Sequence, residues 1–363
     1  MTHRVHNFGA GPAALPRSVL AQAQDEMLDY AGTGMSVLEL SHRSAAYESL
    51  HAAAVADLRA LLGLPESYQV LFMGGGARTQ FALVPMNLCP EAGRAEYLVT
   101  GHWAAGALAE AQKLCAAASV YSSESFGHDR VPSSADYAVR ADSAYLHYTS
   151  NNTIYGTQFH SVPVCPQDVP LVCDMSSDLL SRPLDIERFG VIYAAAQKNL
   201  GPAGVTLVIV HDSLLTRSRA ELPEMFSYAR VAAKSSLLNT PPVYAIYMLG
   251  KVARHLLDAG GLTAAAARNE EKARIIYARI DASGGFYRPH AQPGSRSLMN
   301  VTFRLPDAQL EQAFLDYAAA NEMVGLRGHR SVGGIRVSLY NAVELASVQA
   351  LDALMAEFMR RYG

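Results

Sequence analysis

The sequence lacks the patterns of a metal, nucleic-acid or membrane protein. Its four cysteines show no C-x-x-C spacing, and no histidine-rich tract accompanies them, so a zinc site is not expected and no metal is implied. We interpret Cys89, Cys115, Cys165 and Cys173 as reduced thiols of a cytoplasmic protein. Thirty Lys and Arg against 33 Asp and Glu leave a net charge of −3, which gives no support to binding of nucleic acid or of a membrane surface.

Long hydrophobic runs are also missing. The longest apolar stretch, residues 241–250, is too short to span a bilayer, and no run of signal-peptide length precedes the Gly-Ala-Gly-Pro of residues 9–12. Half of the 363 residues are apolar, which is enough for a large core. We therefore expect one large and one smaller domain that bind a small molecule.

The first two thirds of the chain alternate between helical and strand-like patterns. Apolar residues at three- and four-residue steps predict a helix over 47–61, and further helices are expected over 81–87 and 104–114. Continuous apolar runs predict strands that are covered on both faces, at 70–73, 97–99, 144–148, 171–173, 191–195 and 205–210. This order predicts an α/β fold with a mostly parallel central sheet.

The pattern changes towards the C-terminus. Asn239-Thr240-Pro241 is interpreted as the N-cap and first residue of a helix that runs to Gly260-Gly261. The predicted elements that follow are a helix over 262–281, a strand with alternating faces over 299–304, a helix over 307–321, a strand over 335–340 and a helix over 344–361. We expect a large domain over 15–261 and a small α+β domain over 262–363, joined by the N-terminal segment 1–14.

A glycine turn between a strand and a helix is a candidate phosphate site. Gly74-Gly75-Gly76 would let backbone N–H groups approach an anion, and Arg78 adds positive charge. The turn matches neither G-x-G-x-x-G nor a Walker A loop, which disfavours nucleotide binding. A tight turn without a ligand would have the same sequence.

Asp174 and Lys198 each follow a predicted central strand, at the edge where open α/β sheets bind ligands. Taken singly, Asp174 could cap the next helix and Lys198 could be a surface lysine. Together they are the two groups that pyridoxal phosphate requires, namely an acid for the pyridine nitrogen and an amine that forms a Schiff base.

The chain resembles the phosphoserine aminotransferases, class-V aminotransferases of the aspartate-aminotransferase fold type, over its full length. The matching residues, in chain order, are Asn7-Phe8, Gly11-Pro12-Ala13, Ser41-His42-Arg43, Gly74 to Arg78, Gln80-Phe81, Asp174, Ser176-Ser177, Leu180-Ser181-Arg182-Pro183, Ile192-Tyr193-Ala194, Gln197-Lys198-Asn199, Gly201-Pro202-Ala203-Gly204, Asn239-Thr240-Pro241-Pro242, Gly328-His329-Arg330 and Gly333-Gly334. The resemblance implies pyridoxal 5'-phosphate as cofactor.

The resemblance also implies a role for each cofactor residue. Lys198 would form the Schiff base, Asp174 would pair with the pyridine nitrogen, and Trp103, the only tryptophan, would stack on the ring near Thr153. The remaining residues would surround the cofactor phosphate: Ala77, Arg78, Gln197, and Asn239 with Thr240 of the neighbouring subunit. Trp103 could instead be a core aromatic and Thr153 a turn residue.

The implied reaction exchanges an amino group between L-glutamate and 3-phosphohydroxypyruvate. Arg336 would bind the α-carboxylate, and His329 with Arg330 would bind the distal group. His42 and Arg43 of the other subunit would complete that pocket, so a homodimer with shared sites is implied. A second substrate, the four-carbon phosphorylated analogue of vitamin B6 synthesis, is left open.

Two positions differ from the family pattern. Gly74 stands where histidine is frequent and Ala10 where serine occurs.

Two other functions compete with that of an aminotransferase. A lyase or desulfurase of the same fold would need a catalytic cysteine on a mobile loop, which the apolar settings of the four cysteines disfavour. The third possibility is a noncatalytic phosphate-binding α/β protein in which Lys198 is structural.

Overall fold

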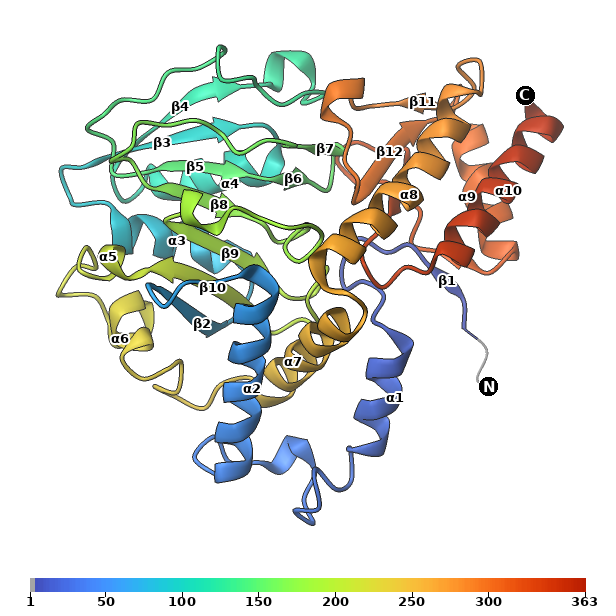
Figure 1. The fold of residues 1–363 in the computed structure, drawn as a ribbon. Coiled ribbons are helices and arrows are strands. Elements are labelled where there is room, and N and C mark those ends of the chain that lie inside the picture. Colours follow the sequence, from blue (N-terminus) through green and yellow to red (C-terminus); the bar gives the residue numbers. More distant parts are fainter. Residues whose placement is uncertain (1–3) are drawn as a thin grey trace.

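A seven-stranded sheet forms the centre of the protein, whose computed structural model describes residues 4–363 (Figure 1). In sheet order the strands are β2 (Tyr68–Gly74), β10 (Val205–His211), β9 (Val191–Ala195), β8 (Leu171–Asp174), β5 (Leu146–Thr149), β3 (Arg94–Val99) and β4 (Ala116–Ser122). The strand β10 runs antiparallel to both of its neighbours, and the other six strands run in one common direction. The predicted α/β fold with a mostly parallel sheet is therefore confirmed.

Neighbouring residues of each strand pack into two different cores. Leu98 of β3 belongs to a cluster with the helices α2 (Ala45–Leu62) and α7 (Val243–Asp258). Tyr97 and Val99 on the opposite face belong to a cluster with α3 (Ala77–Leu88) and α4 (His102–Ala111). Because helices cover both faces, the central strands have continuous apolar sequences.

Three features of this part differ from the sequence prediction. The helix α3 begins four residues earlier than expected, at Ala77, and so forms directly from the glycine turn. The strand β4 was not predicted, because its Ala-rich segment is only partly buried at the edge of the sheet. The predicted cap of α7 was wrong, since this helix begins at Val243 after Pro242. A residue that precedes a proline is disfavoured in the helical conformation, so Pro241 cannot be the first helical residue.

A smaller sheet lies beside the large one (Figure 1). It consists of β11 (Arg288–Pro289), β12 (Asn300–Arg304) and β14 (Ile335–Ser338), and the long helices near it are α8 (Gly261–Asp281), α9 (Ala308–Ala320) and α10 (Leu345–Tyr362). The predicted strand with alternating faces is present as β12, and its polar face is also interior, because Asn300 and Thr302 are buried. Asn300 accepts a hydrogen bond from Asn151 at 2.8 Å and Thr302 donates to the Tyr155 carbonyl at 2.8 Å, so the polar face binds loops of the large sheet.

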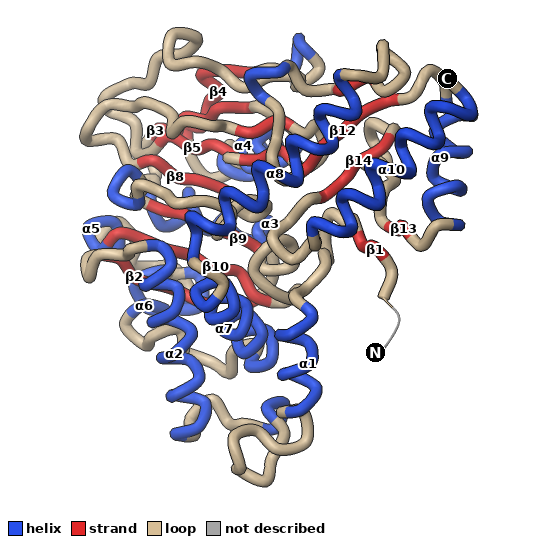
Figure 2. The backbone as a smooth tube through the Cα atoms, turned by 45° about the vertical axis from the view of Figure 1, so that its right-hand side comes forward, coloured by secondary structure: helices blue, strands red, loops and turns tan. Residues whose placement is uncertain are grey.

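The N-terminal segment packs with the C-terminal third of the chain. The short strand β1 (His6–Asn7) pairs in parallel with β13 (Met323–Val324), as Figure 2 shows, and Phe8 is buried in the core of the small sheet. The chain then passes the end of the large sheet and enters α1 (Arg17–Asp25). The remaining short helices, α5 (Asp212–Leu215) and α6 (Tyr228–Ala232), and the β6 (Asn151–Asn152) and β7 (Thr157–Gln158) pair border the large sheet.

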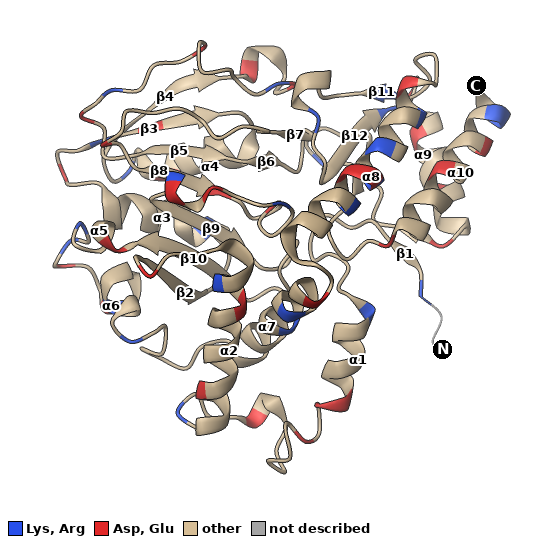
Figure 3. Ribbon diagram, viewed as in Figure 1, with Lys and Arg blue, Asp and Glu red and all other residues tan. Residues whose placement is uncertain are grey.

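Acidic and basic residues occur together on helices that lie next to the large sheet and on helices that lie next to the small sheet (Figure 3). The helix α10 illustrates this, because Glu357 binds both Arg360 and Arg361 on neighbouring turns. No helix among residues 4–363 combines the length and the apolar character needed to cross a bilayer.

Candidate active site

A cavity of about 380 Å³ lies at the carboxyl ends of β8 and β9, where the sequence predicts the site. Its lining residues are Gly76, Ala77, Arg78, Phe81, Trp103, Asp174, Ser176, Ala195, Gln197 and Lys198. Asp174 is the last residue of β8, and Lys198 follows the end of β9 by three residues. The topology thus brings together side chains that are far apart in the sequence.

Asp174 is a buried carboxyl group that faces a lysine. Its Oδ1 accepts a hydrogen bond from the Ser176 backbone N–H at 2.9 Å. Burial raises the pKa of Asp174, while Ser176 and the charge of Lys198 act in the opposite direction. A turn follows Asp174, so the residue caps no helix. The alternative role that its sequence position allowed is therefore wrong.

Lys198 is not a surface lysine. Its side chain reaches into the cavity, and its Nζ lies 5.8 Å from the centroid of the Trp103 ring. Burial lowers the pKa of Lys198 to about 8, although Asp174 opposes this shift. Gly11 of the N-terminal segment packs on Lys198 so closely that a Cβ there would lie 3.3 Å from the lysine Cγ. The lysine is thus held in place and is more easily deprotonated than an exposed one.

The N-terminus of α3 fits a phosphate group. Its N-cap is Gly76 and no side chain caps this helix, so the first amides remain available to an anion. A Cβ at Gly76 would meet no atom within 4 Å, which leaves open space in front of these amides. The Arg78 guanidinium adds positive charge and lies 5.2 Å from the Trp103 ring centroid.

Thr153 links two predicted site residues. Its hydroxyl accepts a hydrogen bond from the Trp103 indole N–H at 3.2 Å, and its carbonyl accepts one from Arg336 at 3.3 Å. The Nε of Arg336 is buried and has no hydrogen-bond partner among the described residues. Burial also lowers the pKa of Arg336. A partly buried guanidinium whose buried Nε has no partner among the described residues is suited to an anionic ligand.

His102 lies beside Trp103, and His329 lies near His102. The ring of His102 is 5.0 Å from that of Trp103 and 6.2 Å from that of His329. Burial lowers the pKa of His329, and the nearby Arg336, His102 and Arg330 lower it further. His102 was not predicted from the sequence, where its only signal is its position next to the single tryptophan.

Other predicted residues lie away from this cavity within the chain. His42 and Arg43 precede α2 in the partly exposed loop that enters this helix. Asn239 and Thr240 are exposed and line a different pocket, together with Gly74 and Thr79. Arg330 is exposed next to His329.

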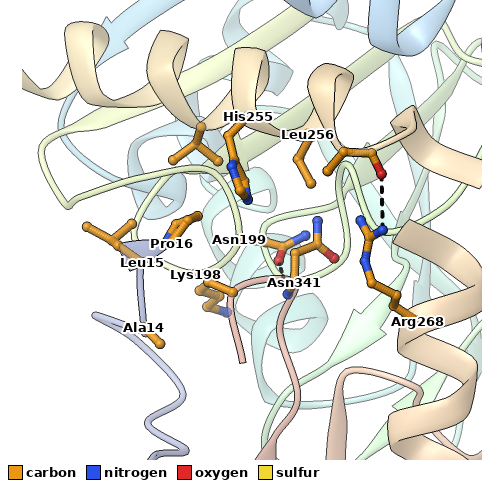
Figure 4. Close-up of a pocket in the computed structure, with 12 residues that line it drawn as sticks. Ala14, Leu15, Pro16, Lys198, Asn199, His255, Leu256, Arg268 and Asn341 are labelled. Atoms are coloured by element: carbon orange, nitrogen blue, oxygen red, sulfur yellow. Dashed lines mark hydrogen bonds between the residues drawn. The ribbon is translucent and has the colours of Figure 1, made fainter. Parts of the chain in front are cut away.

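A second cavity, of about 280 Å³, also reaches Lys198 (Figure 4). It lies between the N-terminal segment and the helices α7 and α8, where Ala14, His255 and Arg268 line it. Asn199 accepts a hydrogen bond from the Asn341 backbone N–H at 2.9 Å and so supports the segment that follows Lys198. Neither Asp174 nor Trp103 lines this space, and Lys198 is the one residue that it shares with the lining of the first cavity.

Comparison with known proteins assigns the chain to a family. The aminotransferase class-V model matches residues 5–351. The chain belongs to the class-V aminotransferase family. It is 51% identical to a phosphoserine aminotransferase of Geobacillus kaustophilus over 99% of both chains. The structure of phosphoserine aminotransferase from Bacillus circulans subsp. alkalophilus is 49% identical, with a TM-score of 0.98 and full coverage of both chains. The structure of phosphoserine aminotransferase from Trichomonas vaginalis with bound PLP (pyridoxal phosphate) is 35% identical, with a TM-score of 0.92. The match covers 97% of this chain and 100% of the Trichomonas chain.

Class-V aminotransferases use pyridoxal phosphate, and the cavity fits this group. A buried acid, a lysine with a lowered pKa, an indole ring and an uncapped helix N-terminus lie around one space. Among residues 4–363, no group of three or more His, Cys, Asp or Glu side chains is arranged to hold a metal ion.

Proposed function

We propose that the protein is a phosphoserine aminotransferase with pyridoxal phosphate as its cofactor. It would transfer the amino group of L-glutamate to 3-phosphohydroxypyruvate and release O-phospho-L-serine and 2-oxoglutarate. The proposal is supported by relatives of that name that are about half identical over the full chain. The single observation that carries it is the placement of Lys198 and Asp174 in one cavity.

Each cofactor residue has a defined task in this proposal. When bound, pyridoxal phosphate supplies an aldehyde and an electron-accepting ring. Lys198 binds the aldehyde, and its Nζ later accepts the proton of the substrate α-carbon, for which a lowered pKa is favourable. Asp174 holds a proton at the ring nitrogen, and Trp103 covers the ring in an orientation that Thr153 supports. The phosphate is bound by Ala77, Arg78 and Gln197, with Asn239 and Thr240 of a neighbouring subunit.

The substrate is bound by cationic groups around the same cavity. Arg336 takes the α-carboxylate, and its unpartnered buried Nε supports this assignment. His329 and Arg330 bind the distal phosphate or carboxylate. His42 and Arg43 of the neighbouring subunit complete this distal site.

We further propose a cytoplasmic homodimer. His42 and Arg43 lie away from their own cavity, and the segment that leads to them exposes Leu28, Met35 and Leu38, which a second subunit would cover. Within each subunit, we propose a large domain over residues 15–261 and a small domain over residues 262–363, joined by the N-terminal segment 1–14. The separate core of the small sheet, which includes Phe8, supports that division.

A coupled assay with glutamate and 3-phosphohydroxypyruvate tests the function. We expect turnover and a visible absorbance of the purified protein that borohydride removes by fixing the cofactor to Lys198. The four-carbon phosphorylated analogue, assayed in parallel, shows whether the longer substrate is also used. Absence of both turnover and colour would favour a noncatalytic protein. Release of sulfur or of another leaving group would indicate a desulfurase or lyase, although no cysteine lines the cavity.

A further inference from the structure

A buried lysine of the helix α8 is bound by backbone carbonyls alone. Lys272 is 2% exposed, and its Nζ donates to the carbonyls of Leu339 at 2.8 Å, Tyr340 at 2.7 Å and Val343 at 3.2 Å. No carboxylate among residues 4–363 contributes to its surroundings. A lysine ammonium group has three N–H donors, so the charged form satisfies all three carbonyls. A lysine is seldom buried in this way unless its charge has a defined partner.

The three carbonyls belong to the turn 339–343, which joins β14 to α10. A second residue of α8 holds the same turn. Asn269 lies one helical turn before Lys272, and its side chain donates to Oδ1 of Asn341 at 2.8 Å. The helix α8 therefore fixes this turn at two places.

One side of the turn contacts the segment that carries Lys198 (Figure 4). The Asn341 backbone N–H donates at 2.9 Å to Oδ1 of Asn199, the residue that follows Lys198. The Asn341 side chain also donates to the Leu180 carbonyl at 2.7 Å, which joins the turn to the segment after β8. A shift of the turn would therefore reach Lys198 through one hydrogen bond.

The turn also contacts the N-terminal segment. The Tyr340 hydroxyl donates to the Ala10 carbonyl at 3.0 Å. Gly11, the next residue, packs against the Cγ of Lys198. The turn thus supports both of the segments that border this lysine.

We propose that Lys272 is a positioning residue for the reaction. Its ammonium group holds the turn 339–343 in the shape in which Asn341 and Tyr340 support the segments around Lys198. Lys272 does not line the cavity of about 380 Å³ and touches no reacting group. The inference rests on the proposed function only in the role of Lys198 as the cofactor lysine.

Reconstitution of the apoenzyme with pyridoxal phosphate tests this role without a substrate. In Lys272→Ala, we expect the visible absorbance to form about tenfold more slowly than in the wild type, because the reacting amine is displaced. The kcat for transamination should fall by about the same factor. Arg279→Met is the matched control, since it removes another cation of α8, one that pairs with Asp352 at 2.7 Å. It should change neither rate.

Propylammonium can replace the part of the side chain that Lys272→Ala removes. A cavity of about 590 Å³ borders Lys272 and gives the ion access to the three carbonyls. We expect propylammonium chloride to restore both rates to within about threefold of the wild type, because the charge binds the carbonyls. Propanol has the same apolar chain without the charge and should not restore them.

A double substitution tests the route from Lys272 to Lys198. Asn199→Ala removes the acceptor of the Asn341 N–H. If Lys272 acts through this contact, adding Lys272→Ala to Asn199→Ala should lower kcat by less than about twofold. Independent, multiplicative losses would overturn the proposal. Unchanged reconstitution of Lys272→Ala, or equal rescue by propanol, would do the same.

Two further comparisons keep the outcome decisive. Lys272→Met keeps the packing of the side-chain stem, so it gives the same reconstitution and double-substitution measurements if Lys272→Ala does not fold. A wild-type protein that gains colour but does not turn over 3-phosphohydroxypyruvate would contradict the proposed substrate. The reconstitution rates would still decide the role of Lys272, because they involve no substrate.

Discussion

The indole N–H of Trp103 donates a hydrogen bond to the hydroxyl of Thr153 across 3.2 Å. The Thr153 carbonyl also accepts a hydrogen bond from Arg336, so one residue contacts both the proposed ring-stacking group and the proposed carboxylate-binding group. Thr153 is buried and follows the short strand β6. The orientation of two substrate-facing side chains therefore depends on this loop of the large sheet.

Thr153→Val is expected to weaken catalysis without unfolding the protein. The substitution keeps the shape but removes the acceptor of the indole N–H, which leaves Trp103 free to tilt. We expect kcat/KM to fall by roughly tenfold, with a shift in the emission of this single tryptophan. Thr153→Ser keeps the hydroxyl and should retain activity and emission. Equal activity of the Val and Ser variants would argue against the role of this hydrogen bond.

Lys198→Ala is expected to abolish transamination and leave a folded protein. The variant loses both the amine that binds the aldehyde and the base that moves the α-proton. It should still bind the cofactor noncovalently, because the acid and the phosphate-binding helix remain. Turnover, circular dichroism and absorbance after borohydride and dialysis measure these three properties. Turnover near that of the wild type would refute the assignment of Lys198.

Asp174→Asn is expected to keep the shape of the site and lose most of the rate. An amide cannot hold the proton at the ring nitrogen, so the ring becomes a weaker electron acceptor. By analogy with the loss of one preorganised electrostatic contact, we expect kcat to fall on the order of 10²-fold or more. Asp174→Glu is the companion variant that keeps the charge. If Asp174→Asn had unchanged kcat, the nitrogen partner would have to be another residue.

Mixed dimers test whether the sites are shared. An inactive Lys198→Ala chain combined with an inactive Arg43→Ala chain should regain activity, because one of the two sites in each hybrid would have both native residues. Hybrids are separated by different affinity tags, and their rate is compared with those of the two parent dimers. A verified hybrid without activity, or a fully active monomer in sedimentation, would contradict the shared site.

His147 is expected to make the fold sensitive to acid. Its Nε2 lies 2.8 Å from the Tyr193 hydroxyl, and burial lowers the pKa of His147 to about 3 from an ordinary value of 6.5. Between these values the unfolded chain binds a proton that the folded chain does not, so acid lowers the free energy of unfolding. The stability advantage of the wild type over His147→Phe should therefore shrink as the pH falls below 6.5.

Urea unfolding at pH 7.5 and pH 5 measures this difference. Tyr193→Phe is the matched control, since it removes the same hydrogen bond and keeps the titrating imidazole. The advantage of the wild type over the control should be nearly the same at both pH values. A pH-independent gap for His147→Phe would show that His147 does not account for the acid sensitivity.

The sequence by itself determined the central strands and the two chemical groups that follow them. Leu171–Asp174 and Val191–Ala195 are continuous apolar runs because helices cover both faces of the sheet. This apolar pattern is local, so it can be recognised in the sequence without knowledge of the fold. The order of motifs determined the family. The start of α7 could also have been read correctly, because the rule that disfavours helix before proline is local.

Only the tertiary structure decided which side chains meet. The contacts of Trp103 with Thr153 and of Thr153 with Arg336 join residues 50 and 183 positions apart, and no periodicity in the sequence encodes such distances. The burial of Asn300 and Thr302 likewise depends on loops of another sheet, which turn a polar strand face into an interior one. The lowered pKa of Lys198 has the same origin, because desolvation and nearby charge are properties of the packed chain.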